Sequence, residues 1–165
     1  MADRGSFDEF YAGAVGRLVG QLFPVTGDLH EAEEVVQEAF TRAAARWSRL
    51  RDYDVPEAWV RRVAMNLVTD RARSLRRQAR AMLKLRPAPE VPPASVEALA
   101  LAEALHTLPV RQRQVLVLHY LVDLSVEEVA HTLGMPDGTV KSLLSRGRHA
   151  LAARLGETEE VLDPS

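Results

Sequence analysis

The sequence predicts an all-α protein of two small helical domains joined by a proline-rich linker, with a helix-turn-helix as the C-terminal domain. Three observations support this fold class. Apolar residues recur at helical spacing in nearly every segment, whereas the alternation expected of strands is almost absent. Four prolines between residues 87 and 93 interrupt the helical pattern. Downstream of them, residues 125–154 have the pattern of two helices around a tight turn.

A capping box begins the first expected helix. The hydroxyl of Ser6 can accept a hydrogen bond from a backbone N–H three residues on, and Glu9 can reach back to the backbone of Ser6. Apolar residues follow at helical spacing up to Leu22. Pro24 and Gly27 then interrupt the pattern, so the helix is expected to end there.

Two more helices are expected before the linker. The segment 28–47 places apolar residues at i, i+3, i+4 and i+7, and Asp28 can cap its N-terminus. After a polar turn, Pro56 stands where a first helical residue is favoured, because its missing N–H would have no partner there. The helix that begins at this proline is expected to extend to about Leu83.

The proline cluster of residues 87–93 is expected to form an extended, semi-rigid linker. We therefore expect the domains on its two sides to move independently in the free protein. Beyond the linker, one helix is expected near residues 95–107, and another begins at Pro109 and ends near Tyr120. The acidic residues from Glu157 onward are expected to fray.

The helix-turn-helix is the most informative segment. Ser125 and Glu128 form a second capping box, the residues from Gly134 to Gly138 supply the break, and the second helix begins near Thr139. From Thr139 to Arg154, this second helix carries four Lys or Arg and no acid, although the whole chain has a formal charge of −2. A basic second helix is a common way of placing side chains in a DNA major groove, and a helical hairpin with a solvated basic face is the alternative. The expected polar face comprises Lys141, Ser142, Ser145, Arg146 and His149, and the apolar face comprises Val140, Leu143, Leu144, Gly147 and Leu151.

Composition excludes several classes of function. The chain has 165 residues and no cysteine, which excludes disulfides, zinc–thiolate sites and thiol catalysis. No apolar run approaches the ~20 residues of a membrane span and no signal-peptide pattern is present, so a cytoplasmic protein is expected. The five histidines lack metal-ligand spacing, and neither a phosphate-binding loop nor a nucleophile elbow occurs. We therefore expect no enzyme activity, no metal or cofactor and no small-molecule substrate.

Positive charge is concentrated in the helix after Pro56. Residues 61–86 contain nine Lys or Arg and a single acid, Asp70. One polar stripe of this helix comprises Arg62, Asn66, Thr69, Arg73, Arg76, Arg77 and Arg80. Because arginine can bind phosphate oxygens and stack on unpaired bases, the stripe indicates a nucleic-acid partner, with a solvated amphipathic face as the alternative. The acidic face of the preceding helix would repel DNA, so it is expected to meet a basic protein or solvent.

In this order, the segments resemble a bacterial RNA polymerase sigma factor of the extracytoplasmic-function type, group IV of the sigma-70 family. HEAEEVVQEAFTRAAARW (30–47) resembles the core-binding helix of that family, and PEAWVRRVAMNLVTDRARSLRR (56–77) resembles its next helix. Residues 108–151 resemble its C-terminal domain. The phrases EAEEVVQEA and PEAWVRRV are typical of an actinobacterial, SigE-like subgroup. The three motifs follow the family's order and cover most of the chain, which makes the resemblance specific.

The resemblance implies a domain organisation and a function. Residues 1–85 correspond to sigma region 2, which binds core polymerase and the −10 promoter element. Residues 86–95 correspond to the linker, which would pass toward the polymerase active-site channel. Residues 96–155 correspond to the region 4 helix-turn-helix, which binds the −35 element, and residues 156–165 form an acidic tail. The implied function is that of an alternative sigma factor, which binds core RNA polymerase and directs promoter-specific transcription initiation.

The resemblance also assigns candidate residues to each partner. Contacts with the clamp coiled coil of the largest polymerase subunit are implied for Glu34, Gln37, Glu38 and Arg42. Contacts with the −10 element are implied for Asn66, Asp70 and Arg73, at the family's motif positions, with Arg62, Arg76 and Arg77 holding phosphates. Contacts with the −35 element are implied for Thr139, Lys141, Ser142, Ser145, Arg146 and Arg148.

The sequence departs from the family pattern at three places. Gly147 replaces the commoner alanine between two arginines and should cost its helix a few tenths to ~1 kcal/mol. Leu143 and Leu144 make the helix more apolar than the family's usual Ser-Arg-Leu, which removes one phosphate contact. The aromatic residues that assist strand opening in housekeeping sigma factors are missing from residues 61–73.

Two other binding functions remain open. A one-component helix-turn-helix transcriptional regulator should add a ligand-binding or dimerisation domain, whereas the first domain here offers its own cationic helix. An anti-sigma or adaptor protein would bind polymerase without DNA. Specific initiation with purified core polymerase distinguishes a sigma factor from both. The expected partners are core RNA polymerase and promoter DNA, with an anti-sigma factor as an open third partner and no insertion into a membrane.

Overall fold

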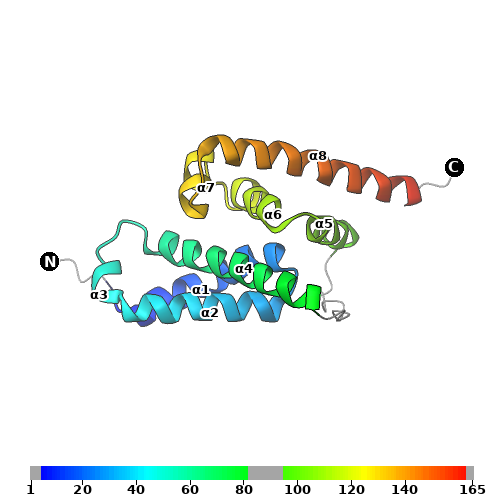
Figure 1. Cartoon of the computed structure of the whole chain (residues 1–165). Coiled ribbons are helices and arrows are strands. Elements are labelled where there is room, and N and C mark those ends of the chain that lie inside the picture. The colour runs from blue at the N-terminus through cyan, green and yellow to red at the C-terminus, as the bar shows by residue number, and fades with distance from the viewer. Residues whose placement is uncertain (1–4, 82–94, 163–165) are drawn as a thin grey trace.

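The computed structural model describes residues 5–81 and 95–162, and these residues form helices and no strands, which confirms the all-α class. The helices lie in two layers, with α1 to α4 in one and α5 to α8 in the other (Figure 1). The first layer comprises α1 (Phe7–Thr26), α2 (Leu29–Ala45), α3 (Trp47–Leu50) and α4 (Pro56–Ala81). The second layer comprises α5 (Val96–His106), α6 (Val110–Leu116), the π-helical turn η1 (Val117–Leu121), α7 (Val126–Leu133) and α8 (Asp137–Leu162).

The caps expected for the first two helices are confirmed. The Ser6 hydroxyl accepts the backbone N–H of residue 9 at 3.3 Å, and Asp28 accepts that of residue 31 at 3.1 Å. Helix α1 ends at Gly27, whose φ of 71° is the left-handed conformation that glycine adopts without strain. The expectation that Pro24 also interrupts the helix is wrong, because this proline lies inside α1. The fixed φ of proline is helical, and the residue lacks only one backbone donor.

The first layer packs around an aromatic cluster, which we define as Phe7, Phe10, Tyr11, Phe40 and Trp47. The ring of Phe40 meets that of Tyr11 edge-on with centroids 4.9 Å apart, and the rings of Phe10 and Trp47 are stacked at 5.0 Å. The chain breaks its helical path at Arg46, so that the expected helix over residues 28–47 ends earlier and a short α3 carries Trp47. This break lets the indole pack on the ring of Phe10.

Helix α4 begins at Pro56, as expected, and is tied to α1 by polar contacts. The guanidinium of Arg17 donates to both carboxylate oxygens of Glu57, at 2.7 and 3.0 Å. The Nε of Arg61 donates to the side-chain oxygen of Gln21 at 2.9 Å. These contacts fix the rotation of α4 about its axis and thereby decide which of its faces points outward.

The helix-turn-helix forms as the sequence predicts, with small changes of boundary. Ser125 and Glu128 make both hydrogen bonds of the capping box, at 3.1 and 2.7 Å, and Gly134 ends α7 with a φ of 63°. Helix α8 begins at Asp137, two residues earlier than expected. The expectation of fraying from Glu157 is wrong as far as Leu162, because α8 continues to that residue. The rest of the acidic tail and residues 82–94, which include most of the expected linker, lie outside the described residues.

Gly147 is buried where α8 crosses α6. A Cβ atom at this position would lie 3.0 and 3.2 Å from two side-chain carbons of Leu116, closer than ordinary van der Waals contact. The glycine therefore allows α8 and α6 to approach each other. The helix propensity that the sequence loses here is offset by closer packing of the two helices.

We expect Gly147→Ala to destabilise the protein by about 1 kcal/mol, although alanine is the better helix former. Overpacking costs ~1–3 kcal/mol, of which the gain in helix propensity recovers at most ~1 kcal/mol. Chemical denaturation measures the change. Gly138→Ala is the matched control, because a Cβ there meets no atom within 4 Å and should leave stability unchanged or raised. Equal stabilisation by both substitutions would contradict the close approach.

The two layers pack against each other, so the expectation of independently moving domains is not met in this structure. Helix α4 contacts α6 and α7, and α1 contacts α5, α6 and η1. The wholly buried Gln114 of α6 donates its amide to the backbone carbonyl of Met65 at 2.9 Å and to the hydroxyl of Thr69 at 3.0 Å. Arg113 donates to the carbonyl of Val25 at 2.7 Å. The composition of a linker cannot predict these contacts, because they depend on the faces that it joins.

Within residues 5–81 and 95–162, no helix combines the length and apolar character that a bilayer span requires. The same residues include no group of three His, Asp or Glu placed to hold a metal ion.

Candidate nucleic-acid interface

The stripe of polar and basic residues on α4 is largely exposed. Of its members, Arg62, Asn66, Arg73, Arg76 and Arg77 are exposed, as the periodicity of the sequence predicts, and Asp70 beside them is exposed as well. The ion pairs among the described residues include none of the four arginines of this set. The side chain of Arg80 is outside the described part of the structure. The exposed arginines are therefore available to anions, since their donors are not committed to carboxylates.

Thr69 is the exception within the stripe, because it is only 5 % exposed. Its hydroxyl donates to the carbonyl of Met65 at 3.1 Å and accepts the amide of Gln114. The sequence places Thr69 with the polar residues, and its burial depends on a helix that lies 45 residues further along the chain. The buried Thr69 thus divides the stripe into an N-terminal part, Arg62 and Asn66, and a C-terminal part from Arg73 onward.

Two arginines of α4 have structural contacts that distinguish them from the stripe. Arg61 is half-buried against α1, and burial lowers the pKa of its guanidinium more than the nearby Glu57 raises it. Arg71 points toward α2, where it contacts Glu34 at 3.2 Å and Glu38 at 3.7 Å. Arg61 directly precedes the outward-facing Arg62, and one residue separates Arg71 from the outward-facing Arg73. Arg61 and Arg71 therefore hold α4 in place while Arg62 and Arg73 face outward.

The polar face of α8 is also exposed. Thr139, Lys141, Ser142, Arg146 and Arg148 are exposed and Ser145 is half-buried, whereas Val140 and Leu144 are buried against the neighbouring helices. Arg148 donates to the hydroxyl of Tyr120 at 2.9 Å, a contact that the sequence does not predict. This bond restricts the position of its guanidinium, and Arg146 has no comparable tether among the described residues.

The acidic face of α2 is held by contacts within its own layer. Arg42 contacts Glu38 at 2.9 Å, His30 contacts Glu34 at 3.0 Å, and Gln37 donates to the hydroxyl of Tyr11. Glu34, Gln37 and Arg42 are exposed and Glu38 is half-buried. The sequence correctly places these residues on the outward side of the helix, but it does not reveal that Arg71 bridges two of them.

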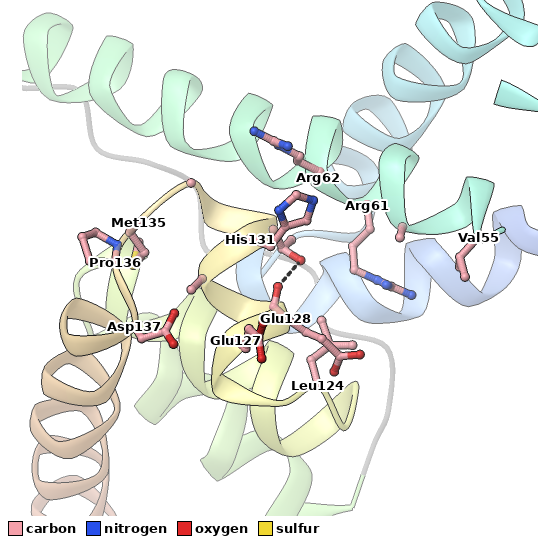
Figure 2. Close-up of a pocket in the computed structure, with 14 residues that line it drawn as sticks. Val55, Arg61, Arg62, Leu124, Glu127, Glu128, His131, Met135, Pro136 and Asp137 are labelled. Carbon is pink, nitrogen blue, oxygen red and sulfur yellow. Dashed lines mark hydrogen bonds between the residues drawn. The ribbon is translucent and has the colours of Figure 1, made fainter. Parts of the chain in front are cut away.

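A groove lies between α4 and the helix-turn-helix. Its volume is about 850 Å³, and it is lined by the start of α4, by α7 and by the turn before α8. Figure 2 shows His131 pointing from α7 toward α4, near Arg62. Glu127, Glu128 and Asp137 supply carboxylates on the wall opposite Arg61 and Arg62. The sequence offers no signal for this groove, because its walls come from segments about 70 residues apart.

The N-terminal and C-terminal parts of the chain each match a family model. Residues 10–78 match the model "Sigma-70 region 2", and residues 98–151 match the model "Sigma-70, region 4". The first match includes α2 and α4 as far as residue 78, and the second includes α7 and α8 as far as residue 151.

Curated relatives and solved structures are similar over most of the chain. The RNA polymerase sigma-E factor of Streptomyces coelicolor is 32% identical over 95% of this chain and 88% of its own length. The ECF RNA polymerase sigma factor SigW of Bacillus subtilis is 32% identical over 81% of this chain and 80% of its own. The sigma factor RpoE of Bartonella quintana, solved in complex with the anti-sigma factor NepR, has a similar fold, with a TM-score of 0.78 at 22% identity over 91% of this chain and 96% of that one. CnrH, solved with the cytosolic domain of CnrY, has a TM-score of 0.62 at 28% identity over 92% of this chain and 88% of that one.

Proposed function

The chain belongs to the sigma-70 family of RNA polymerase sigma factors, in its extracytoplasmic-function branch, and we propose from this membership which of its surfaces bind core polymerase and which bind promoter DNA. The protein binds core RNA polymerase and directs it to its promoters. Residues 1–85 form the part that binds core polymerase and the −10 element, and residues 96–155 form the part that binds the −35 element. The observation that carries this division is the presence of two outward-facing cationic surfaces on separate helices, α4 and α8.

Helix α4 contacts the −10 element. Its exposed arginines can bind phosphate oxygens and stack on bases that have left the duplex, as single-strand binding requires. Asn66, Asp70 and Arg73 face the bases, and Arg62, Arg76 and Arg77 hold the backbone. The contacts of Arg61 and Arg71 with the rest of the layer keep this face outward.

Helix α8 enters the major groove at the −35 element. Its N-terminal turns expose Thr139, Lys141 and Ser142, and the next turn places Ser145 and Arg146 on the same side. The buried Val140 and Leu144 pack this helix on its own domain, so that the polar side faces the DNA. Arg148 lies at the flank, where a phosphate is the available partner.

The acidic face of α2 binds the clamp coiled coil of the polymerase. Glu34, Gln37, Glu38 and Arg42 form the contact. Arg71 orients the two carboxylates in advance, Tyr11 orients Gln37, and Glu38 orients Arg42. The protein carries out no chemistry of its own, because the polymerase supplies the active site. It acts in the cytoplasm, where polymerase and chromosome are found, and an anti-sigma factor is a third proposed partner.

Transcription with purified core polymerase tests the proposal. Core polymerase with the full-length protein should initiate at discrete start sites on genomic fragments, and sequencing of the transcripts should reveal shared −10 and −35 elements. Core polymerase alone is the control. DNA binding without initiation would instead indicate the one-component regulator, and polymerase binding without DNA recognition would indicate an adaptor.

Charge reversal on α2 should separate polymerase binding from folding. Because Glu38 contacts Arg42 and lies near Arg71, Glu38→Lys both removes a partner carboxylate and places a third cation among them. We expect core binding to weaken about tenfold, less than the loss of a fully buried charge pair would cause. Fluorescence titration of core polymerase measures the change, and circular dichroism checks that helicity is kept.

Glu33→Lys is the matched control for this substitution, since Glu33 is exposed on another face of the same helix. It makes the same change in net charge and should leave core affinity within about twofold of the wild type, the scatter of a surface substitution. Undiminished affinity of the Glu38→Lys variant would contradict the assignment of α2 to the polymerase.

A further inference from the structure

Tyr120 is an exposed aromatic residue that belongs to neither of the DNA-binding surfaces proposed above. It lies in the π-helical turn η1, before the helix-turn-helix begins, and it is 52 % exposed. Its hydroxyl accepts a hydrogen bond from Nη1 of Arg148 on α8 at 2.9 Å, although the two residues are 28 positions apart in the chain. Helix α8 lies along α6, which η1 continues (Figure 1). The phenol is therefore placed beside the helix that is proposed to enter the major groove.

The contact between Tyr120 and Arg148 lies on one edge of the polar face of α8. At about 100° per residue, Lys141, Ser145 and Arg148 fall within about 60° of one another around the helix. Arg146 lies further round the same face. A helix in the major groove has a phosphate strand along each side, because the groove is only about 12 Å wide. A side chain beside this edge of α8 therefore meets a phosphate strand when the helix is in the groove.

Local structure holds the ring of Tyr120 in place. The turn η1 is closed by a backbone bond of 3.0 Å from the N–H of Val122 to the carbonyl of Val117, five residues back. The ring of His119 packs edge-on against that of Tyr120 with centroids 4.9 Å apart, and its Nδ1 donates to the carbonyl of Leu124 at 2.8 Å. Single π-helical turns are frequent at functional sites. The hydroxyl is therefore presented at a fixed place before DNA binds.

The hydroxyl of Tyr120 retains a donor for a ligand. A phenol has one O–H donor besides its acceptor lone pairs, and Arg148 occupies only a lone pair. No acceptor for this O–H is found among the described residues. A hydroxyl that accepts from a cation becomes a stronger donor, because successive hydrogen bonds polarise one another. Arg148 forms no ion pair within the described ranges, so its other N–H groups are also available to an anion.

We propose that Tyr120 and Arg148 form a phosphate clamp on the −35 duplex, in which the hydroxyl and the guanidinium both donate to non-bridging oxygens of one phosphate. The inference rests on the proposed role of α8 at the −35 element. A phosphate is the partner that fits, because two adjacent donors, one of them cationic, meet at one edge of the helix. The clamp makes Tyr120 a DNA contact from outside the helix-turn-helix, and it fixes the register of α8 without reading a base.

Binding of the holoenzyme to a promoter measures what the hydroxyl contributes. Tyr120→Phe removes only the hydroxyl from an exposed ring and should weaken binding about fivefold, a typical loss for one hydrogen bond. Arg148→Ala should weaken it about tenfold. The double variant should lose about twentyfold, less than the product because both donors share one phosphate, and more than Arg148→Ala because Tyr120 makes a bond of its own. Tyr53→Phe is the matched control, since Tyr53 is 51 % exposed on the first layer, and it should change binding less than about twofold.

Neutral methylphosphonate linkages, placed one at a time along the −35 element, locate the phosphate. With the wild-type holoenzyme, one linkage should weaken binding about tenfold, because it removes the charge and an oxygen that the clamp holds. In the Tyr120→Phe variant the effect of this linkage should be clearly smaller, and in the double variant it should fall to about twofold or less. Lys141→Ala is the control for a general loss of affinity. It removes another cation from the same edge of α8 and should leave the effect of this linkage unchanged.

The outcomes separate this inference from the proposed function. Unchanged binding by Tyr120→Phe overturns the clamp. A double variant no weaker than Arg148→Ala also overturns it, because Tyr120 then only positions Arg148 and does not touch DNA. A loss in Tyr120→Phe that leaves every linkage effect unchanged overturns it as well. In these three cases the proposed function stands if Arg146→Ala still relaxes the base preference. If no −35 linkage affects the wild type and Arg146→Ala leaves the base preference intact, the assignment of α8 to the −35 element is itself wrong.

Discussion

Phe40→Ala should lower the free energy of unfolding by about 3–5 kcal/mol, the usual cost of removing a buried aromatic ring. Phe40 is 2 % exposed, and its ring meets those of Tyr11, Phe10 and Phe7 at centroid distances of 4.9, 5.6 and 6.3 Å. Its loss leaves a cavity where α1, α2 and α3 meet. Rigid helices on three sides prevent the site from collapsing, so both the transfer and the cavity contributions apply.

Denaturant titration followed by tryptophan fluorescence measures this loss. Trp47 stacks on Phe10 in the same cluster, so its emission reports directly on the packing there. Leu29→Ala is the control on the same helix, because Leu29 is exposed and its truncation should change stability by at most about 0.5 kcal/mol. A loss below about 1 kcal/mol for Phe40→Ala would show that the aromatic cluster is not the core of this layer.

Arg146→Ala should cost about 1–3 kcal/mol of promoter binding and relax the base preference at one position. Arg148→Ala should instead weaken binding to all sequences alike and reduce the slope of the salt dependence by about one unit. The structure gives a reason for the difference. Arg148 is tethered to Tyr120 by a bond of 2.9 Å, and a guanidinium held at the flank of α8 is suited to a phosphate.

Binding of the holoenzyme to a promoter library at several salt concentrations measures both effects. Tyr120→Phe is the matched probe of the tether, since it removes the hydroxyl and keeps the ring. It should reproduce part of the Arg148→Ala effect and leave the base preference intact. Equal, sequence-independent losses from Arg146→Ala and Arg148→Ala would contradict base contact by α8 and leave it as a phosphate-binding helix.

Features that depend on neighbours along the chain could be predicted from the sequence. The N-cap bond of Ser6 and the capping box at Ser125 formed because donor and acceptor lie within one helical turn. The exposure of Arg62, Arg73 and Arg146 followed from a periodicity of 3.6 residues. Even among such local features one prediction was wrong. Pro24 was expected to interrupt α1, but its φ suits a helix as well as a turn.

Features of the candidate surfaces that depend on distant residues could not be predicted. Thr69 has the spacing of an exposed stripe residue, but α6 buries it. Arg71 and Arg73 differ in the sequence only by their angular position on the helix. In the structure, Arg71 contacts the carboxylates of Glu34 and Glu38 on α2 and so helps to hold α4 in place. Gly147 weakens its helix by propensity alone, but in the folded protein it lets α8 pack on α6.

The sequence by itself determined the helices, their caps, the helix-turn-helix and the sign of the charge on each exposed face. Those properties come from interactions within a few residues and from the helical repeat, which are the same wherever the helix packs. The tertiary structure alone decided that α6 and α7 lie against α4 while α8 stays free. Such packing depends on which faces of two helices fit together and on whether a buried amide such as that of Gln114 finds partners, and neither is encoded in local spacing.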